Sequence, residues 1–136
     1  MEQLTIQNLG STIKFELCKE AEWDGGYGNC IARIKYEYYG RTIYSEQIWG
    51  LNVWLLQQFV DEMKSMSSTF KGEARLSSND GDSLVMKMVD EYGHIYVDIK
   101  DGMDGYNGYV HINFSIDQSY LHELIEQAEE MCPKEK

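Results

Sequence analysis

The side chains best suited to chemistry in this sequence are Asp98 and His111. Both lie on predicted strands joined by residues 101–108, and a hairpin centred on that stretch pairs the two directly. A carboxylate that accepts a hydrogen bond from an imidazole N–H is the arrangement that orients a general base. No nucleophile accompanies the pair, because Ser115 and His94 are expected roughly 13 Å away along the strands. We interpret Asp98 and His111 as a cross-strand surface contact and predict that the protein is not an enzyme.

The sequence contains no convincing metal-binding or phosphate-binding motif. Asp101, Asp104 and Asn107 are spaced three apart, whereas calcium loops space their first ligands two apart. The glycines around Tyr27 lead into a predicted strand, so no helix N-terminus follows them to receive a phosphate. The three cysteines show no C-x-x-C spacing. We expect no metal, no cofactor and no disulfide framework.

Two stretches in which a predicted strand leads into an amphipathic helix organise the chain. Residues 109–131 alternate between apolar and polar at first, and apolar residues then recur at helical spacing. Residues 42–66 repeat the pattern, and a shift of 66 residues superposes the two helices. Four short strand-like runs precede each helix, so the chain reads as ββββα written twice. We predict an α+β fold with an antiparallel sheet of about eight strands, two helices on one side and pseudo-twofold symmetry.

The sequence leaves open whether the two halves share one continuous sheet or form two facing sheets. A single domain spanning residues 1–136, with internal halves 1–66 and 67–132, is expected, because a chain of 136 residues with 43% hydrophobic content buries one core. No run approaches the roughly 20 apolar residues of a membrane span, and the first residues lack the features of a secretion signal. We expect a cytoplasmic protein that makes no membrane contact.

Charge is the most informative bulk property. The formal net charge is −11, and residues 1–66 carry 6 basic and 9 acidic side chains against 6 and 14 in residues 67–136. Such a field repels nucleic acid and speeds association with a basic partner. Acidic proteins are also common, and a charge of this sign keeps a protein soluble whatever it binds. We predict a basic protein partner and no nucleic-acid binding.

One sheet face of the second half is the first candidate binding surface. If both helices cover the opposite face, this one is open, and it is polar, aromatic and acid-bearing. Tyrosine gives a large contact area at low entropic cost, and acids pair with lysine or arginine. Tyrosine is also an ordinary strand residue. The residues of this face are Tyr96, Asp98, Tyr109 and His111, and the expected register pairs Tyr96 with Asn113 and Lys100 with Tyr109.

The two long loops, residues 19–29 and 101–108, are the second candidate surface. They combine acidic, aromatic and glycine residues, and loops of this kind often carry recognition. An exposed tryptophan would support this hypothesis, and one folded back onto the core would remove it. The candidate contacts are Trp23, Asp24 and Tyr27 in the first loop and Asp101, Asp104 and Tyr106 in the second.

Three segments of the second half resemble one protein family. They are Gly93-His94-Ile95-Tyr96-Val97, Phe114-Ser115-Ile116 and Asp117-Gln118-Ser119-Tyr120-Leu121. Together they resemble the WapI-type immunity proteins, small bacterial proteins that protect a cell from the toxin domain of a wall-associated or contact-dependent effector. Ser119 stands where the family more often has threonine, and it keeps a capping hydroxyl. The resemblance implies binding to a cognate toxin, often an RNase, without catalysis.

Two functional hypotheses follow. The first is an intracellular immunity protein that binds and neutralises a cognate toxin domain, a nuclease, by occluding its basic active-site surface. The alternative is a non-enzymatic ligand-binding or adaptor module that uses the open sheet face. A concave pocket and indifference to any toxin would favour the alternative. The oligomeric state is left open by the sequence.

Overall fold

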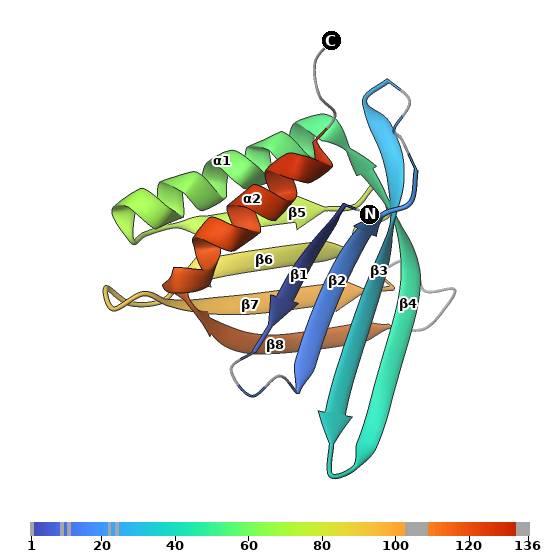
Figure 1. Ribbon diagram of the computed structural model, residues 1–136, viewed down its shortest axis with the longest axis horizontal. Helices are drawn as coiled ribbons and strands as arrows, with labels where there is room; N and C mark the ends of the chain where they lie inside the picture. Colours follow the sequence, from blue (N-terminus) through green and yellow to red (C-terminus); the bar gives the residue numbers. More distant parts are fainter. Residues whose placement is uncertain are drawn as a thin grey trace.

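Alternating apolar residues form the inner faces of two four-stranded antiparallel sheets (Figure 1). The fold is that of a computed structural model, which describes residues 2–8, 10, 12–21, 23, 25–102 and 109–132. Each sheet is a simple meander, with strand orders β1-β2-β3-β4 and β5-β6-β7-β8. The prediction of an α+β fold with about eight antiparallel strands and two helices is confirmed, and the strands form two sheets.

Each half of the chain contributes one sheet and one helix. The first half contains β1 Gln3–Gln7, β2 Ile13–Lys19, β3 Tyr27–Tyr38, β4 Arg41–Asn52 and α1 Val53–Thr69. The second half contains β5 Glu73–Ser77, β6 Ser83–Met88, β7 His94–Asp101, β8 Val110–Asp117, the 3-10 helix η1 Gln118–Tyr120 and α2 Leu121–Met131.

A side-chain cap precedes each helix. The side-chain oxygen of Asn52 accepts from the backbone N–H groups of Trp54 and Leu55, at 2.8 and 3.2 Å, and so caps α1. Asp117 provides the cap of the turn before α2. Its carboxylate accepts from the N–H of Ser119 at 2.9 Å and starts the 3-10 turn that leads into the helix.

The two helices pack reciprocally across the halves. In Figure 1, α1 lies along β5, the first strand of the second sheet, and α2 lies beside β1, the first strand of the first sheet. Each also satisfies a backbone group of that strand. Glu62 of α1 accepts from the N–H of Arg75 at 3.1 Å, and Gln127 of α2 accepts from the N–H of Thr5 at 2.9 Å. The helices therefore cover one edge of each sheet, and they contact each other.

One hydrophobic core lies between the two sheets and the helices. The predicted helix stripe of Leu121, Leu124, Ile125, Ala128 and Met131 is buried, as are the inner residues of β2 and β7. Of the two arrangements that the sequence left open, the structure has two facing sheets. The inner face of the second sheet is therefore covered by the first sheet as well as by the helices, which buries the apolar faces of all these elements together.

The predicted pairing of β7 with β8 is wrong by two residues. Asp98 pairs with Asn113, Tyr96 with Ser115 and Lys100 with His111. The reason is that β7 continues to Asp101, which pairs with Val110, so the connection starts one residue later than expected. A shift of two residues leaves every side chain on its predicted face, because strand side chains alternate with period two.

Candidate partner-binding surface

The outer face of the second sheet is open to solvent. Its side chains come from alternate positions of β6, β7 and β8, and their neighbours on each strand point into the core. Tyr96 is 38% exposed, and His111 and Asn113 are exposed as well, so neither helix covers this face. Tyr109, just before β8, is also exposed, and its ring centroid lies 6.4 Å from that of His111.

Asp98 and His111 are hydrogen-bonded across this face. Asp98 Oδ1 lies 2.7 Å from His111 Nε2, although the two residues are diagonal rather than direct partners in the ladder. Both side chains are partly exposed, at 23% and 40%. His94 lies at the far end of β7 and is engaged by Asp90, whose carboxylate is 2.6 Å from its Nδ1. The geometry suits a surface contact that holds an imidazole in a fixed orientation.

Charge on this face is mixed. Lys100 is two residues after Asp98 on β7, so the two side chains share a face. Lys87 of β6 pairs with Tyr96 and therefore lies on that face as well. The hydrogen bond that His94 donates to Asp90, together with the negative charge of Asp90, raises the pKa of His94 above its ordinary value. This surface therefore offers tyrosine and histidine contacts without an excess of acid.

The first loop presents its tyrosine but not its tryptophan. Trp23 packs against the core and over the backbone of Gly28, and Lys19 Nζ lies 5.4 Å from its ring centroid. Its indole N–H is buried and has no acceptor among the described residues. Tyr27 is 58% exposed. Asp24 lies outside the described residues. Trp23 folds back onto the core, so the support that an exposed tryptophan would have given to the loop hypothesis is absent, and Tyr27 is the exposed aromatic residue in the described part of the first loop.

Sequence reasoning missed the partner of Tyr27. Trp54, in the first turn of α1, is 58% exposed, and its ring meets that of Tyr27 edge to face at a centroid distance of 6.0 Å. The signal was available, because Trp54 falls off the apolar stripe that α1 buries. A large aromatic residue on the polar side of an amphipathic helix indicates a surface contact.

The second loop begins with a buried carboxylate. Asp101 was expected in an exposed loop, and this is wrong: it ends β7 and is fully buried. Its Oδ1 accepts from the indole N–H of Trp49 in β4 at 2.8 Å, and Ser45 Oγ lies 3.4 Å from Oδ2. Burial raises the pKa of Asp101, and the bond from Trp49 opposes that rise. Asp104 and Tyr106 lie outside the described residues.

The β3–β4 hairpin carries a further surface that the sequence did not single out. Its turn end projects past the other strands in Figure 1. Large apolar and aromatic side chains there are more than half exposed. They are Tyr38, Tyr39, Ile43 and Tyr44. Tyr38 and Ile43 lie on the same face of the sheet as Ala32 and Ile34, but the second sheet does not reach this end of the hairpin, so both side chains are left in solvent.

Metal-ligating clusters and membrane-spanning helices are both absent from the described part of the chain. There, no group of three or more His, Cys, Asp or Glu side chains is arranged to hold a metal ion. Within the same ranges, neither helix combines the length and apolar character that crossing a bilayer requires.

Comparison with known proteins identifies the family. Residues 2–134 match the family described as the immunity protein WapI-like family. Among solved structures, the chain is similar to the CdiA-CT/CdiI toxin and immunity complex from Enterobacter cloacae, with 9% sequence identity and a TM-score of 0.45, over 85% of this chain and 99% of that one. Comparison with curated protein sequences gives no match. Because the family match spans nearly the whole chain, this protein belongs to the WapI-like family of immunity proteins.

Proposed function

We propose that this immunity protein neutralises a cognate bacterial toxin domain in the cytosol by covering a basic active-site surface, without catalysing a reaction. Its net charge of −11 is the observation that carries the proposal. A nuclease must attract an anionic substrate, so its active site is lined with basic residues. An acidic protein is complementary to such a surface and competes with the substrate for it.

The charge also accounts for how such a complex forms. Electrostatic steering raises the rate of association between oppositely charged proteins, which matters when an incoming toxin must be captured before it acts. The same field disfavours nucleic acid as the ligand. Tyrosine and tryptophan side chains exposed on several faces are suitable hot-spot residues for a protein interface.

The test uses the C-terminal domain of the effector encoded beside the gene for this chain. We expect a stable complex, loss of the nuclease activity of the toxin, and an association rate that falls at least tenfold between about 50 mM and about 500 mM salt. The rate of dissociation should change much less. A neighbouring effector domain that neither binds the chain nor loses activity in its presence would refute the proposal.

Variants on the second sheet test whether its open face meets the toxin. Tyr96→Ala removes an exposed aromatic side chain from that face, and Tyr92→Ala removes one from the β6–β7 turn as a matched control. The sequence-based prediction is that only Tyr96→Ala weakens the complex. Equal affinities for the two variants would leave the toxin proposal standing and exclude this face.

A further inference from the structure

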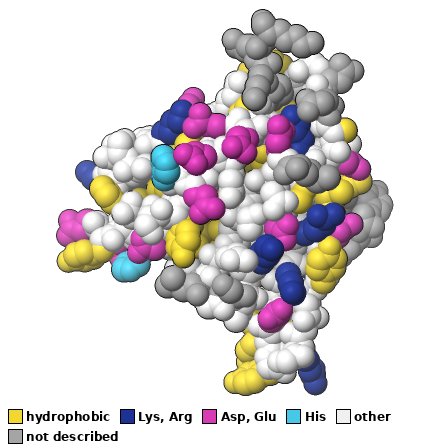
Figure 2. All heavy atoms as spheres, viewed as in Figure 1, with side chains coloured by type: hydrophobic (Ala, Val, Ile, Leu, Met, Phe, Trp, Pro, Cys, Tyr) yellow, Lys and Arg dark blue, Asp and Glu magenta, His cyan; other side chains and the backbone are white. Residues whose placement is uncertain are grey.

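The acidic excess of this protein is concentrated on α2. The helix carries four glutamates and no lysine or arginine. Figure 2 shows acidic side chains in a row across the face on which α2 lies, opposite the outer face of the second sheet. Two of the glutamates are engaged, one by His122 and one by Lys64. Glu123 and Glu130 have no ion-pair partner among the described residues.

The fold does not require this charge. The helices α1 and α2 occupy reciprocal places, each packed on the first strand of the other half. Outside its buried stripe, α1 carries two acids and one lysine, for a net charge of −1, whereas α2 carries −4 with His122 neutral. Since both helices perform the same packing, the additional acid on α2 is free to serve recognition.

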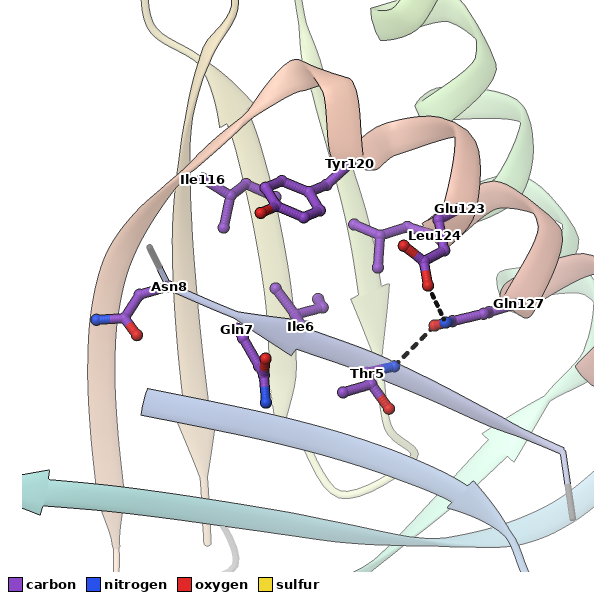
Figure 3. A pocket seen from close by; sticks show the side chains of 9 residues that line it. All are labelled: Thr5, Ile6, Gln7, Asn8, Ile116, Tyr120, Glu123, Leu124 and Gln127. Carbon is purple, nitrogen blue, oxygen red and sulfur yellow. Dashed lines mark hydrogen bonds between the residues drawn. The ribbon is translucent and has the colours of Figure 1, made fainter. Parts of the chain in front are cut away.

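A groove lies beside this acidic row, between β1 and α2. It has a volume of about 160 Å³. Its floor is apolar and buried, and its rim is polar and partly or fully exposed (Figure 3). The floor consists of Ile6, Ile116 and Leu124, and the rim includes Tyr120, Glu123 and Gln127.

The rim residues are held in place by bonds within the fold. Gln127 Oε1 accepts from the N–H of Thr5 at 2.9 Å, and Gln127 Nε2 donates to Glu123 Oε1 at 3.4 Å. This chain of bonds fixes Glu123 at the mouth of the groove, where Figure 3 shows its carboxylate beside Leu124. The ring of Tyr120 lies across the groove from β1 and is 46% exposed.

We infer that this groove receives an arginine side chain from a basic segment of the partner. The aliphatic stem of arginine suits the floor of Ile116 and Leu124, the guanidinium can stack on Tyr120, and Glu123 can accept its N–H groups. Arginine fits better than lysine, because its planar group is weakly hydrated and bonds a carboxylate at two points.

Charge disfavours the other occupants of the groove. A second copy of the chain would bring two proteins of net charge −11 together, and nucleic acid would face the same repulsion. A basic protein segment is attracted instead. The inference rests on the proposed function, and it assigns the docking of the basic segment to α2 rather than to the outer face of the second sheet, whose charge is mixed.

The first experiment needs no toxin. N-acetyl-L-argininamide is titrated into the isotope-labelled protein, and backbone amide shifts are followed by NMR. We expect saturable shifts confined to the groove, around residues 5–8 and 116–127, and smaller shifts with N-acetyl-L-lysinamide. Glu123→Gln should abolish them, whereas Glu130→Gln, which removes the same charge from the same helix outside the groove, should not. Shifts spread over all the acidic surfaces, or unaltered by Glu123→Gln, would overturn the inference.

The second experiment uses the toxin domain identified by the binding test above. Glu123→Gln should weaken the complex roughly tenfold, and Glu130→Gln less than twofold. If the toxin binds both variants equally, the arginine site is wrong and the proposed function stands. If no toxin domain binds the unaltered protein, both the proposed function and this inference are refuted. Self-association that Glu123→Gln relieves would identify a second copy as the occupant and also overturn it.

Discussion

Replacing Asp101 with alanine should loosen the junction between the two sheets. The carboxylate is fully buried and accepts from the indole N–H of Trp49 at 2.8 Å, so it ties β7 of the second sheet to β4 of the first. The variant leaves that N–H buried without an acceptor. A backbone bond from Asn79 to Gly50, at 2.8 Å, also joins the sheets at this end and limits the damage.

The size of the effect follows from the type of bond. A hydrogen bond to a charged acceptor contributes about 1.5–3 kcal/mol, and a buried donor left unpaired costs a similar amount. We expect Asp101→Ala to lower the free energy of unfolding by about 2–3 kcal/mol. For a domain of this length, the midpoint of thermal unfolding should fall by about 6–15 °C. Asp101→Asn keeps an acceptor oxygen, so its cost should be at most about 1 kcal/mol.

The pH dependence of the free energy of unfolding is a second test of the buried Asp101 carboxylate. Burial raises the pKa of Asp101, so the folded state binds its proton more tightly than the unfolded state. The ionised carboxylate therefore costs stability at neutral pH, and this cost disappears as the pH falls through the raised pKa. The unaltered protein should gain stability relative to Asp101→Asn between about pH 7 and about pH 4.

Urea unfolding followed by tryptophan fluorescence and near-ultraviolet circular dichroism measures these changes. Asp80→Ala is the matched control, because Asp80 lies in an exposed turn between β5 and β6. The reasoning is refuted if Asp101→Ala and Asp80→Ala unfold at the same urea concentration. It is also refuted if Asp101→Ala weakens toxin binding while stability is unchanged, since Asp101 would then be a contact residue.

Three further predictions concern other parts of the fold. Asn52→Ala should cost about 1 kcal/mol of unfolding free energy through loss of the α1 cap, and Asn52→Asp should restore most of it in the same urea assay. Gly28→Ala places a Cβ where the Trp23 ring lies, so the ring must move, and a red-shifted tryptophan emission with intact far-ultraviolet circular dichroism should report it. Asp90 raises the pKa of His94, and His94 lowers that of Asp90, so the pair stabilises the fold most between the ordinary pKa values of aspartate and histidine and loses its contribution as the pH rises through the raised pKa of His94. An NMR titration in which Asp90→Asn leaves the pKa of His94 unchanged would contradict that prediction.

Local patterns were sufficient to predict the buried faces of β7 and α2. The period-two alternation in β7 and the helical stripe in α2 depend only on neighbouring residues, and both are seen in the structure. The Tyr39-Gly40 turn was also predictable, since both residues have positive φ angles of 48° and 75°, which a two-residue hairpin of this type requires.

What the sequence could not supply was the packing between distant elements. Asp101 reads as a loop acid until Trp49, 52 residues away, is brought beside it. The period-two pattern places Tyr38 on the same face as the buried residues Ala32 and Ile34, yet the second sheet does not extend over Tyr38. The register of β7 with β8 depended on where the connection between them begins. The alternation of apolar and polar residues cannot reveal a register shift of two residues, because such a shift leaves every side chain on the same face.

The duplicated architecture gives these differences functional meaning. When two halves share a fold, residues that differ between equivalent places are not needed to build it. Glu62 and Gln127 both bond the first strand of the other half, so that contact belongs to the fold. Glu123 at the mouth of the groove and the acidic row on α2 have no such counterpart on α1, whose net charge is −1. We therefore expect variants that remove charge from α2 to lower toxin affinity with little change in stability.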